Sequence, residues 1–335
     1  MSFNDDAGLD TSQVEGGGGG SGFGGGGLGG GFGGGGFGGG GGFGGGGFGG
    51  GGMAVGGGLG TIVLLVLFLF LGHGGGGGGT TAGTTAGVQD PYDTSQVGGA
   101  GASRGDTFSQ CRTGADANRD AQCRVIGTVN SVQDFWAGEL PKYGKEYTRA
   151  KTVLYSGRAQ SACGTASNQV GPFYCPNDKR VYIDASFFDE LTSRFGAEGG
   201  PLAQEYVVAH EYGHHIQDIL GLLDRAQQDP QGASSGSVRT ELMADCLAGD
   251  WVKHASQTRD ASGRTLLKPI TQSDIKAALS AAAAVGDDRI QQKTQGRVTP
   301  ETWTHGSSAE RERWFTIGYT AGDLNQCDTF HAAKL

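Results

Sequence analysis

Glycine is the feature that most limits what this chain can fold into. It accounts for 69 of the 335 residues, and its densest stretch runs from Gly16 to Gly79. A glycine tract buries almost no apolar surface and loses the most backbone entropy on ordering, so it builds no hydrophobic core. We therefore expect a disordered tail at residues 1–52, a flexible linker at 73–104 and a globular domain at 105–335. A domain of about 230 residues is long enough for one buried core.

One apolar run, Ile62 to Leu71, interrupts the glycine tract. Such a run covers only about 15 Å as a helix, but the uncharged stretch from Met53 to Gly72 is long enough to cross a bilayer. We predict a single-pass transmembrane anchor at residues 53–72. A cleaved signal peptide fits less well, because no Lys or Arg precedes Arg104 to form its basic region. A buried core helix also fits less well, because glycine linkers on both sides leave it no neighbours.

Charge and cysteine content limit the partners and the compartment. The formal net charge is −9, with no cluster of Lys and Arg, which excludes a nucleic-acid partner. The even number of cysteines, without a CxxC pair, indicates disulfides formed outside the cytoplasm, in the periplasm or at the cell surface. Buried free thiols in a cytosolic protein are the alternative. Proximity and elimination suggest the pairs Cys111–Cys123, Cys163–Cys175 and Cys246–Cys327.

The domain sequence predicts an α+β fold, with a small antiparallel-containing sheet packed on several helices. A helix is expected over residues 128–140, with Thr128 as its cap. Strand-like segments follow at 151–157, 170–175 and 179–188, with a turn at Pro176-Asn177-Asp178. Helical patterns dominate the remainder of the chain.

The stretch "HEYGHH" carries the most chemistry and matches the motif HExxH. It lies inside a helix predicted from Pro201 to Gly221, so His210 and His214 share one face, the arrangement in which two imidazoles hold one zinc ion. Glu211 points about 100° away, towards a water beside the metal, and is the candidate general base. Gly213 either leaves room for substrate or permits close helix packing. His215 is expected in the core or behind the ligands.

A catalytic zinc ion needs a third protein ligand. The helical pattern "SVRTELMADCLAGDWVKH" places Glu241 and Asp245 four residues apart on one face. Glu241 is the candidate ligand, and Asp245 is expected to accept a hydrogen bond from a ligand histidine. The plain alternative for this pair is a solvated helix face.

Several motifs together resemble a known family. "HEYGHH", "RTELMADCLAG", "CGTASNQVGPFYCPNDKRVYIDASFF", "THGSSAERERWF" and "GDLNQCDTF" are similar to the bacterial neutral zinc metallopeptidases of the membrane-anchored YpfJ type. The resemblance implies a zincin-like peptidase with Zn²⁺ on His210, His214 and Glu241 and a catalytic Glu211. The long glycine insertion departs from the family pattern.

His305 is a further candidate catalytic residue. Ser307 and Glu310 form a capping-box pattern, which places His305 in a loop just before the last helix, where it could stabilise an oxyanion. The alternative is a surface histidine, with Tyr182 or Tyr212 in the oxyanion role.

Together these features predict a zinc-dependent endopeptidase that acts on peptides or proteins. A strand near Val181 to Asp184 is expected to form a sheet edge that pairs with an extended substrate. One alternative is a zinc-stabilised, non-catalytic binding or scaffold module of the cell envelope. Another is a glycine-rich structural protein whose folded domain is incidental.

Overall fold

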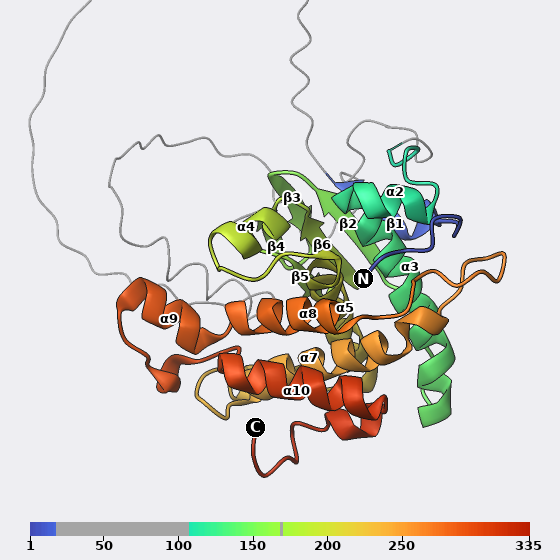
Figure 1. Ribbon diagram of the computed structural model, residues 1–335. Coiled ribbons are helices and arrows are strands. Elements are labelled where there is room, and N and C mark those ends of the chain that lie inside the picture. The colour runs from blue at the N-terminus through green and yellow to red at the C-terminus, as the bar shows by residue number, and fades with distance from the viewer. Residues whose placement is uncertain (18–106, 168–169) are drawn as a thin grey trace, which may run out of the picture.

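The computed structural model describes residues 1–17, 107–167 and 170–335. Within these ranges the protein is α+β, as predicted (Figure 1). The strands are β1 (Val14–Gly17), β2 (Lys151–Tyr155), β3 (Arg158–Ser161), β4 (Gly164–Ser167), β5 (Phe173–Cys175) and β6 (Arg180–Asp184). The helices are α2 (Gly114–Arg119), α3 (Ala121–Glu139), α4 (Phe187–Ser193), α5 (Pro201–Leu220), α6 (Asp224–Gln228), α7 (Gly236–His254), α8 (Gln272–Ala284), α9 (Asp287–Gln295) and α10 (Ser308–Ala321).

The main sheet has four strands in the order β1-β2-β6-β5. Strands β1, β2 and β6 are parallel, and β5 is antiparallel to β6. Side chains alternate across this sheet, since Leu154 and Ile183 join the main core under the helices while Tyr155 and Tyr182 join a smaller cluster on the opposite face. The three segments predicted as strands contain β2, β5 and β6. Because β6 lies between β2 and β5, however, the prediction that it forms a free edge is wrong.

Helix α5 is the central element of the helical layer. It packs on α3, α7 and α8, and α10 covers α7 and α8 on the far side (Figure 1). The helix begins at Pro201 and ends at Gly221, which takes the left-handed conformation with φ 72°, as its sequence predicts. Helices α5 and α7 pack against each other in the core of the domain. They bring His210 and Glu241, which are 31 residues apart in the sequence, into contact.

The predicted start of the first long helix is wrong by several residues. Helix α3 begins at Ala121, where the Asp120 side chain accepts a hydrogen bond from the Cys123 amide. Thr128 instead lies inside the helix, and its hydroxyl donates to the Arg124 carbonyl at 2.8 Å. A threonine can satisfy its hydroxyl within a helix in this way, so its presence alone does not mark a helix start.

Three disulfides join the cysteines in the expected pairs, Cys111–Cys123, Cys163–Cys175 and Cys246–Cys327. The third bond ties α7 to the C-terminal segment, across 81 residues of sequence. All six cysteines of the chain are therefore bonded.

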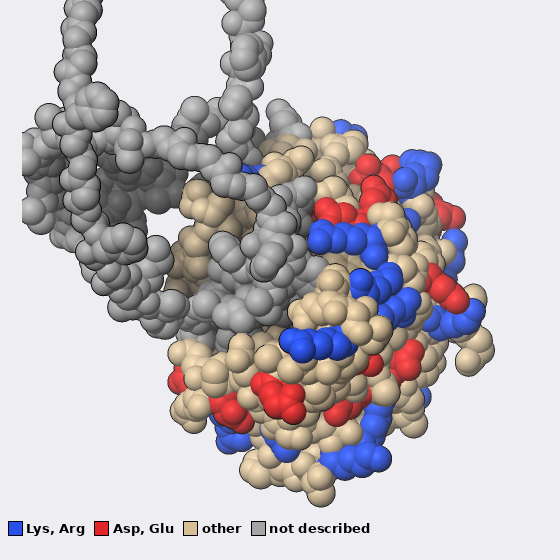
Figure 2. Space-filling view, turned by 90° about the vertical axis from the view of Figure 1, so that its left-hand side faces the viewer, with Lys and Arg blue, Asp and Glu red and all other residues tan. Residues whose placement is uncertain are grey.

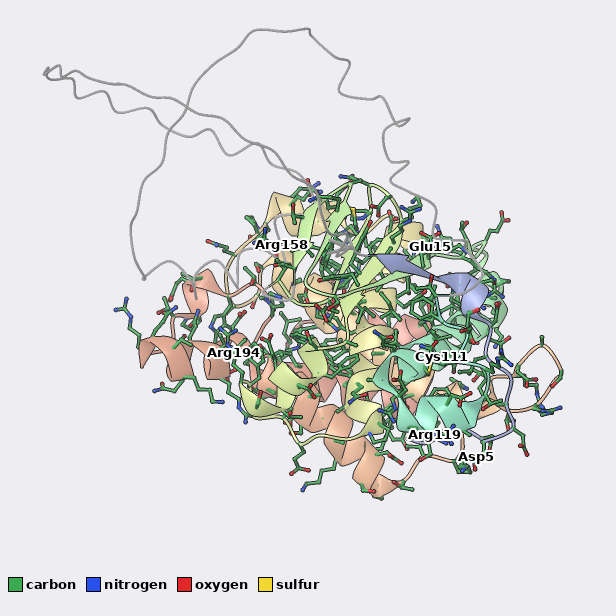
Figure 3. The ribbon with its side chains drawn as sticks, turned by 90° about the horizontal axis from the view of Figure 1, so that it is seen from above. Asp5, Glu15, Cys111, Arg119, Arg158 and Arg194 are labelled. Atoms are coloured by element: carbon green, nitrogen blue, oxygen red, sulfur yellow. A yellow bond between two sulfur atoms is a disulfide. The ribbon has the colours of Figure 1, made fainter. Side chains whose placement is uncertain are left out.

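Residues 1–17 belong to the folded domain, which corrects the prediction that they form part of a disordered tail. Phe3 is fully buried, and its ring fills the space beside Gly127, where an added Cβ would come within 2.5 Å of it. Val14 starts strand β1 beside Thr152. Figure 3 shows this segment, between the labelled Asp5 and Glu15, lying against the helices that follow Cys111. The remaining residues of the predicted tail, the predicted linker at 73–104 and the first two residues of the predicted domain lie outside the described ranges.

The predicted membrane anchor at residues 53–72 also lies outside the described residues, and no helix within them is long and apolar enough to cross a bilayer. Residues 1–17 and 107–335 share one core. The single-pass anchor stays a prediction.

On the face shown in Figure 2, acidic and basic side chains are interspersed over the described residues. The absence of a nucleic-acid partner stays a prediction.

Candidate metal centre

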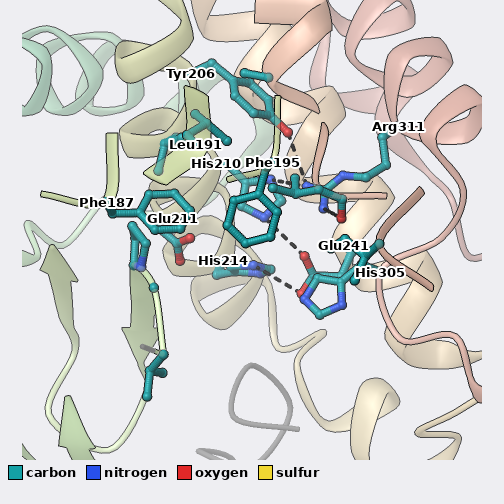
Figure 4. Close-up of a pocket in the computed structure, with 17 residues that line it drawn as sticks. Phe187, Leu191, Phe195, Tyr206, His210, Glu211, His214, Glu241, His305 and Arg311 are labelled. Carbon is teal, nitrogen blue, oxygen red and sulfur yellow. Dashed lines mark hydrogen bonds and ion pairs between the residues drawn. The ribbon is translucent and has the colours of Figure 1, made fainter. Parts of the chain in front are cut away.

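Three predicted ligands meet where α5 packs on α7. His210 Nε2 lies 3.1 Å from Glu241 Oε2, and His214 Nε2 lies 3.5 Å from Glu241 Oε1. One donor atom from each side chain lies within 4.8 Å of the other two. Figure 4 shows the three side chains facing one another at the base of a pocket. The helical spacing of His210 and His214 therefore places both rings towards the same carboxylate.

The donor set fits a zinc ion. Ligand atoms about 2.1 Å from a tetrahedral ion lie about 3.4 Å from one another, close to the separations of Glu241 from the two histidines. Two imidazoles and one carboxylate also form a ligand set found in zinc hydrolases, which leave the fourth position open. His210, His214 and Glu241 are all more than nine-tenths buried.

The charges of the site favour a cation. Burial opposes ionisation of Glu241, but the neighbouring imidazoles, His214 first, hold the pKa of its carboxyl well below the ordinary value. Burial likewise opposes a charged His210 ring, yet Asp245 and Glu241 raise its pKa to about 10. The carboxylates of Asp245 and Glu241 therefore favour positive charge at His210. A bound metal ion would supply this charge in place of the proton.

His210 is oriented by Asp245, as the sequence predicts. Its Nδ1 lies 2.9 Å from Asp245 Oδ1, on the side of the ring away from Glu241. Arg311 from α10 donates to the same carboxylate, from Nε to Oδ2 at 2.8 Å and from Nη2 to Oδ1 at 2.9 Å, and the Tyr206 hydroxyl also donates to it. Although Asp245 is buried, the Arg311 guanidinium lowers the pKa of its carboxyl. Asp245 is thus held ionised behind the histidine.

His214 is oriented by a residue of its own helix. Its Nδ1 lies 2.9 Å from Gln217 Oε1, and the Gln217 amide donates to the Thr240 carbonyl at 2.6 Å. Thr240 directly precedes Glu241. The position of His214 is therefore linked to the backbone that carries the third ligand.

Glu211 lies in the same pocket and has a free carboxylate oxygen. Its side chain is buried, and Oε2 has no hydrogen-bond partner within the described residues. Burial raises the pKa of the carboxyl above its ordinary value, against the effect of His210 and His214. Figure 4 places Glu211 on the opposite side of His214 from Glu241. A buried polar atom without a partner is costly, so this oxygen is available to a water or a substrate.

His305 also lines the pocket, on the Glu241 side (Figure 4). Its loop is fixed by Asp287, whose Oδ2 accepts hydrogen bonds from the amides of Thr304, His305 and Gly306 at 2.6–3.0 Å. The Ser307–Glu310 capping box is present as predicted. Burial alone would lower the pKa of the His305 ring, but Glu241 and Asp287 raise it. The alternative of a surface histidine is therefore wrong.

Other sequence candidates lie elsewhere. The Tyr212 hydroxyl bonds Thr152 and that of Tyr182 bonds Asp178, so neither tyrosine reaches the pocket. His215 contacts Tyr174 and the Thr148 carbonyl in the core, as expected for a residue behind the ligands. Gly213 faces α7, where an added Cβ would lie 3.0 Å from Ala244, so it serves close helix packing and leaves no space for substrate.

Comparison with known proteins agrees with this arrangement. Residues 35–330 match the model of a family described as "Putative neutral zinc metallopeptidase". The chain belongs to this family. Its members share a description that suggests a zinc-dependent hydrolase, and the match spans every residue of the candidate centre.

Proteins of Mycobacterium and Escherichia are similar to this chain. The chain is 58% identical to uncharacterized protein Rv2575 of Mycobacterium tuberculosis and to uncharacterized protein Mb2605 of Mycobacterium bovis, in each case over 68% of this chain and 77% of the relative. It is 42% identical to uncharacterized protein YpfJ of Escherichia coli, over 64% of this chain and 73% of the relative. No solved structure matches the chain.

Three residues that support the centre were not predicted from the sequence. Arg311, Asp287 and Gln217 hold Asp245, the His305 loop and His214 respectively. Arg311 lies within the motif "THGSSAERERWF". Nothing in the spacing of that motif shows which of its charged side chains turns into the core.

Proposed function

We propose that this protein is a zinc-dependent endopeptidase that hydrolyses peptide bonds. The observation that carries the proposal is the unpartnered Glu211 carboxylate, which shares one pocket with His210, His214 and Glu241. A purely structural zinc site usually has four protein ligands and gains nothing from a buried carboxylate beside them.

Each side chain has a separate role in this proposal. His210, His214 and Glu241 hold the zinc ion, which when bound would supply Lewis-acid polarisation of the scissile carbonyl and of a water. Glu211 takes a proton from the attacking water and transfers it to the leaving amine. His305 donates a hydrogen bond to the carbonyl oxygen as negative charge develops on it. Asp245 keeps His210 in the orientation that ligation requires.

The sheet offers a place for the substrate backbone. Strand β5 ends the strand order, so within the described residues one of its edges has no partner. Gly171 and Pro172 line the pocket directly before this strand. We propose that an extended peptide pairs with β5, in place of the strand near Val181 suggested by the sequence.

The disulfides indicate the compartment in which the domain folds. Three disulfides in one domain are typical of proteins that fold in an oxidising environment. We propose that the domain acts outside the cytoplasm, in the periplasm or at the cell surface.

The experiment that tests the function uses the full chain, because residues 1–17 form part of the core. Zinc-loaded protein and its Glu211→Gln variant are incubated with a broad peptide library, and products are identified by mass spectrometry. We expect internal cleavage by the wild type and a loss of at least about 100-fold in the variant. Zinc binding without cleavage by either protein would support the non-catalytic scaffold function instead.

A further inference from the structure

The pocket is lined by polar and by apolar side chains. The polar side chains are those of the metal centre, and the titratable residues that line the pocket are His210, Glu211, His214, Glu241, His305 and Arg311, together with the Tyr206 hydroxyl. The apolar wall comes from α4, the segment after it, α8 and α9, and it is built from Phe187, Leu191, Phe195, Ala281, Val285 and Ile290. The cavity measures about 110 Å³, room for one side chain of moderate size.

No charge among the polar side chains of the pocket is free to bind a charged substrate side chain. Arg311 is the one permanent cation among the lining residues, and both of its hydrogen bonds to Asp245 turn it away from solvent. Glu241 is bound to the two histidines, and His305 lies beside Asp287. Glu211 and His305 are both required beside the scissile bond. A charged side chain entering the cavity would therefore lose its hydration without gaining a partner.

The apolar wall is held in place by specific contacts. Gly171 has φ 77°, and a Cβ there would lie 3.3 Å from the Phe187 ring, so this glycine allows the ring to close on the pocket. The rings of Phe187 and Phe195 lie 6.2 Å apart. Figure 4 shows Phe187 on the same side of the pocket as Glu211.

Helix α9 fixes the segment that carries Phe195. Lys293 Nζ donates to the carbonyls of Arg194 and Phe195, each at 3.2 Å, and Arg289 donates to the Gly196 carbonyl at 3.1 Å. These side chains bind the carbonyls of the segment directly after α4. The position of Phe195 is thus supported by α9.

We propose that this wall is a specificity subsite that binds an apolar side chain of moderate size, aliphatic or aromatic, of the substrate residue next to the scissile bond. The proposal rests on the peptidase function and adds the substrate class. Leu191, Phe195 and Phe187 are the residues that determine specificity. Lys293 is a positioning residue, because it acts only through Phe195.

The test compares peptides that differ only at the residue beside the bond cleaved in the library experiment. We expect kcat/KM to be higher for Leu or Phe than for Ala by about 10–200-fold, the range for methylene groups in an apolar pocket, and to be lowest for Asp and Lys. Phe195→Ala should reduce the ratio of Leu to Ala and leave zinc stoichiometry unchanged. Val298→Ala, at an exposed apolar residue away from the pocket, is the matched control and should keep the wild-type ratio.

Lys293→Met tests the positioning role. It removes the charge that holds the Phe195 segment and keeps the length of the side chain. We expect a higher KM for the Leu peptide with little change in kcat, because the wall loosens while the metal centre stays intact. Equal effects on peptides with Leu and with Ala would show that Lys293 acts through stability alone.

A binding measurement separates this proposal from the catalytic one. Fluorescence anisotropy of the same labelled peptides on the zinc-loaded Glu211→Gln variant reports recognition without turnover. Tighter binding of Leu and Phe peptides with no cleavage by the wild type would overturn the peptidase function and keep the subsite. Cleavage without preference, or a preference for charged residues, would overturn the subsite and keep the peptidase function.

Discussion

Arg311 and Asp245 form a buried, two-point ion pair behind the metal centre. The guanidinium donates from Nε and Nη2 to the two carboxylate oxygens at 2.8 and 2.9 Å, and the same carboxylate accepts from His210. Both residues are almost inaccessible to solvent. Helix α10 therefore takes part in the site without supplying a metal ligand.

Asp245→Asn should weaken zinc binding by about 10–100-fold, the usual effect of removing the partner of a ligand histidine. An amide carries no negative charge and has only one oxygen, so it cannot accept hydrogen bonds from Arg311 and His210 as the carboxylate does. Competition with a chelator of known affinity measures the change. Asp224→Asn, at an exposed aspartate on α6, is the control and should bind zinc like the wild type. An unchanged affinity in Asp245→Asn would show that the pair serves stability alone.

Phe3→Ala should destabilise the whole domain by about 3–5 kcal/mol, the cost of deleting a buried aromatic ring. The ring is fully buried and packs against Gly127 of α3. Urea denaturation followed by circular dichroism measures the change. Ser12→Ala, in the same segment but exposed, should have little effect. A disordered tail would give equal, negligible effects for both substitutions.

The N-terminal segment and the rest of the domain should lie on the same side of the membrane. Ser12→Cys and Gln295→Cys each place one thiol at an exposed position, while the native cysteines are bonded. A membrane-impermeant maleimide applied to intact cells should label both variants, or both only after the membrane is opened. Labelling of Gln295→Cys alone would support the single-pass anchor and would show that residues 1–17 do not join the folded domain in cells.

Asp250 should make the domain less stable as the pH rises towards neutrality. Burial, then the Glu139 and Asp323 carboxylates, raise the pKa of its carboxyl from 3.8 to about 7. Below about pH 4 the carboxyl is protonated in both the folded and the unfolded protein, so it does not change the free energy of unfolding. As the pH rises to about 7, the unfolded protein loses this proton first, and the folded state becomes progressively less stable. Asp250→Asn should therefore be more stable than the wild type by more than about 1 kcal/mol at pH 7, with the difference vanishing near pH 4. Urea denaturation at both pH values measures it, and a constant difference would contradict the shifted pKa.

The metal ligands were predictable because helical periodicity is local. Four residues bring His210 and His214 to one face whatever surrounds the helix, and the same holds for Glu241 and Asp245. The helix boundaries at Pro201 and Gly221 follow from equally local preferences. Proximity in sequence suggested the pairs Cys111–Cys123 and Cys163–Cys175, and elimination left Cys246–Cys327.

Apart from the start of α3, which depends on local hydrogen bonds, the failures involve contacts between distant segments. Phe3 is buried by helices more than a hundred residues away, and the glycine tract that begins at Gly16 pointed to disorder of the whole N-terminal segment. Gly213 is explained by Ala244 on another helix, and Arg311 by Asp245. The position of β6 inside the sheet depends on β2, which no pattern within β6 records. Such partners emerge only from the tertiary fold.

The most direct test of the metal centre is the zinc K-edge absorption spectrum of the full chain loaded with one equivalent of zinc. We predict a single tightly bound ion per chain with two imidazole nitrogens and oxygen ligands, and a loss of this signal in His214→Gln. Sulfur ligands, or no stoichiometric zinc in the folded protein, would contradict a centre built from His210, His214 and Glu241.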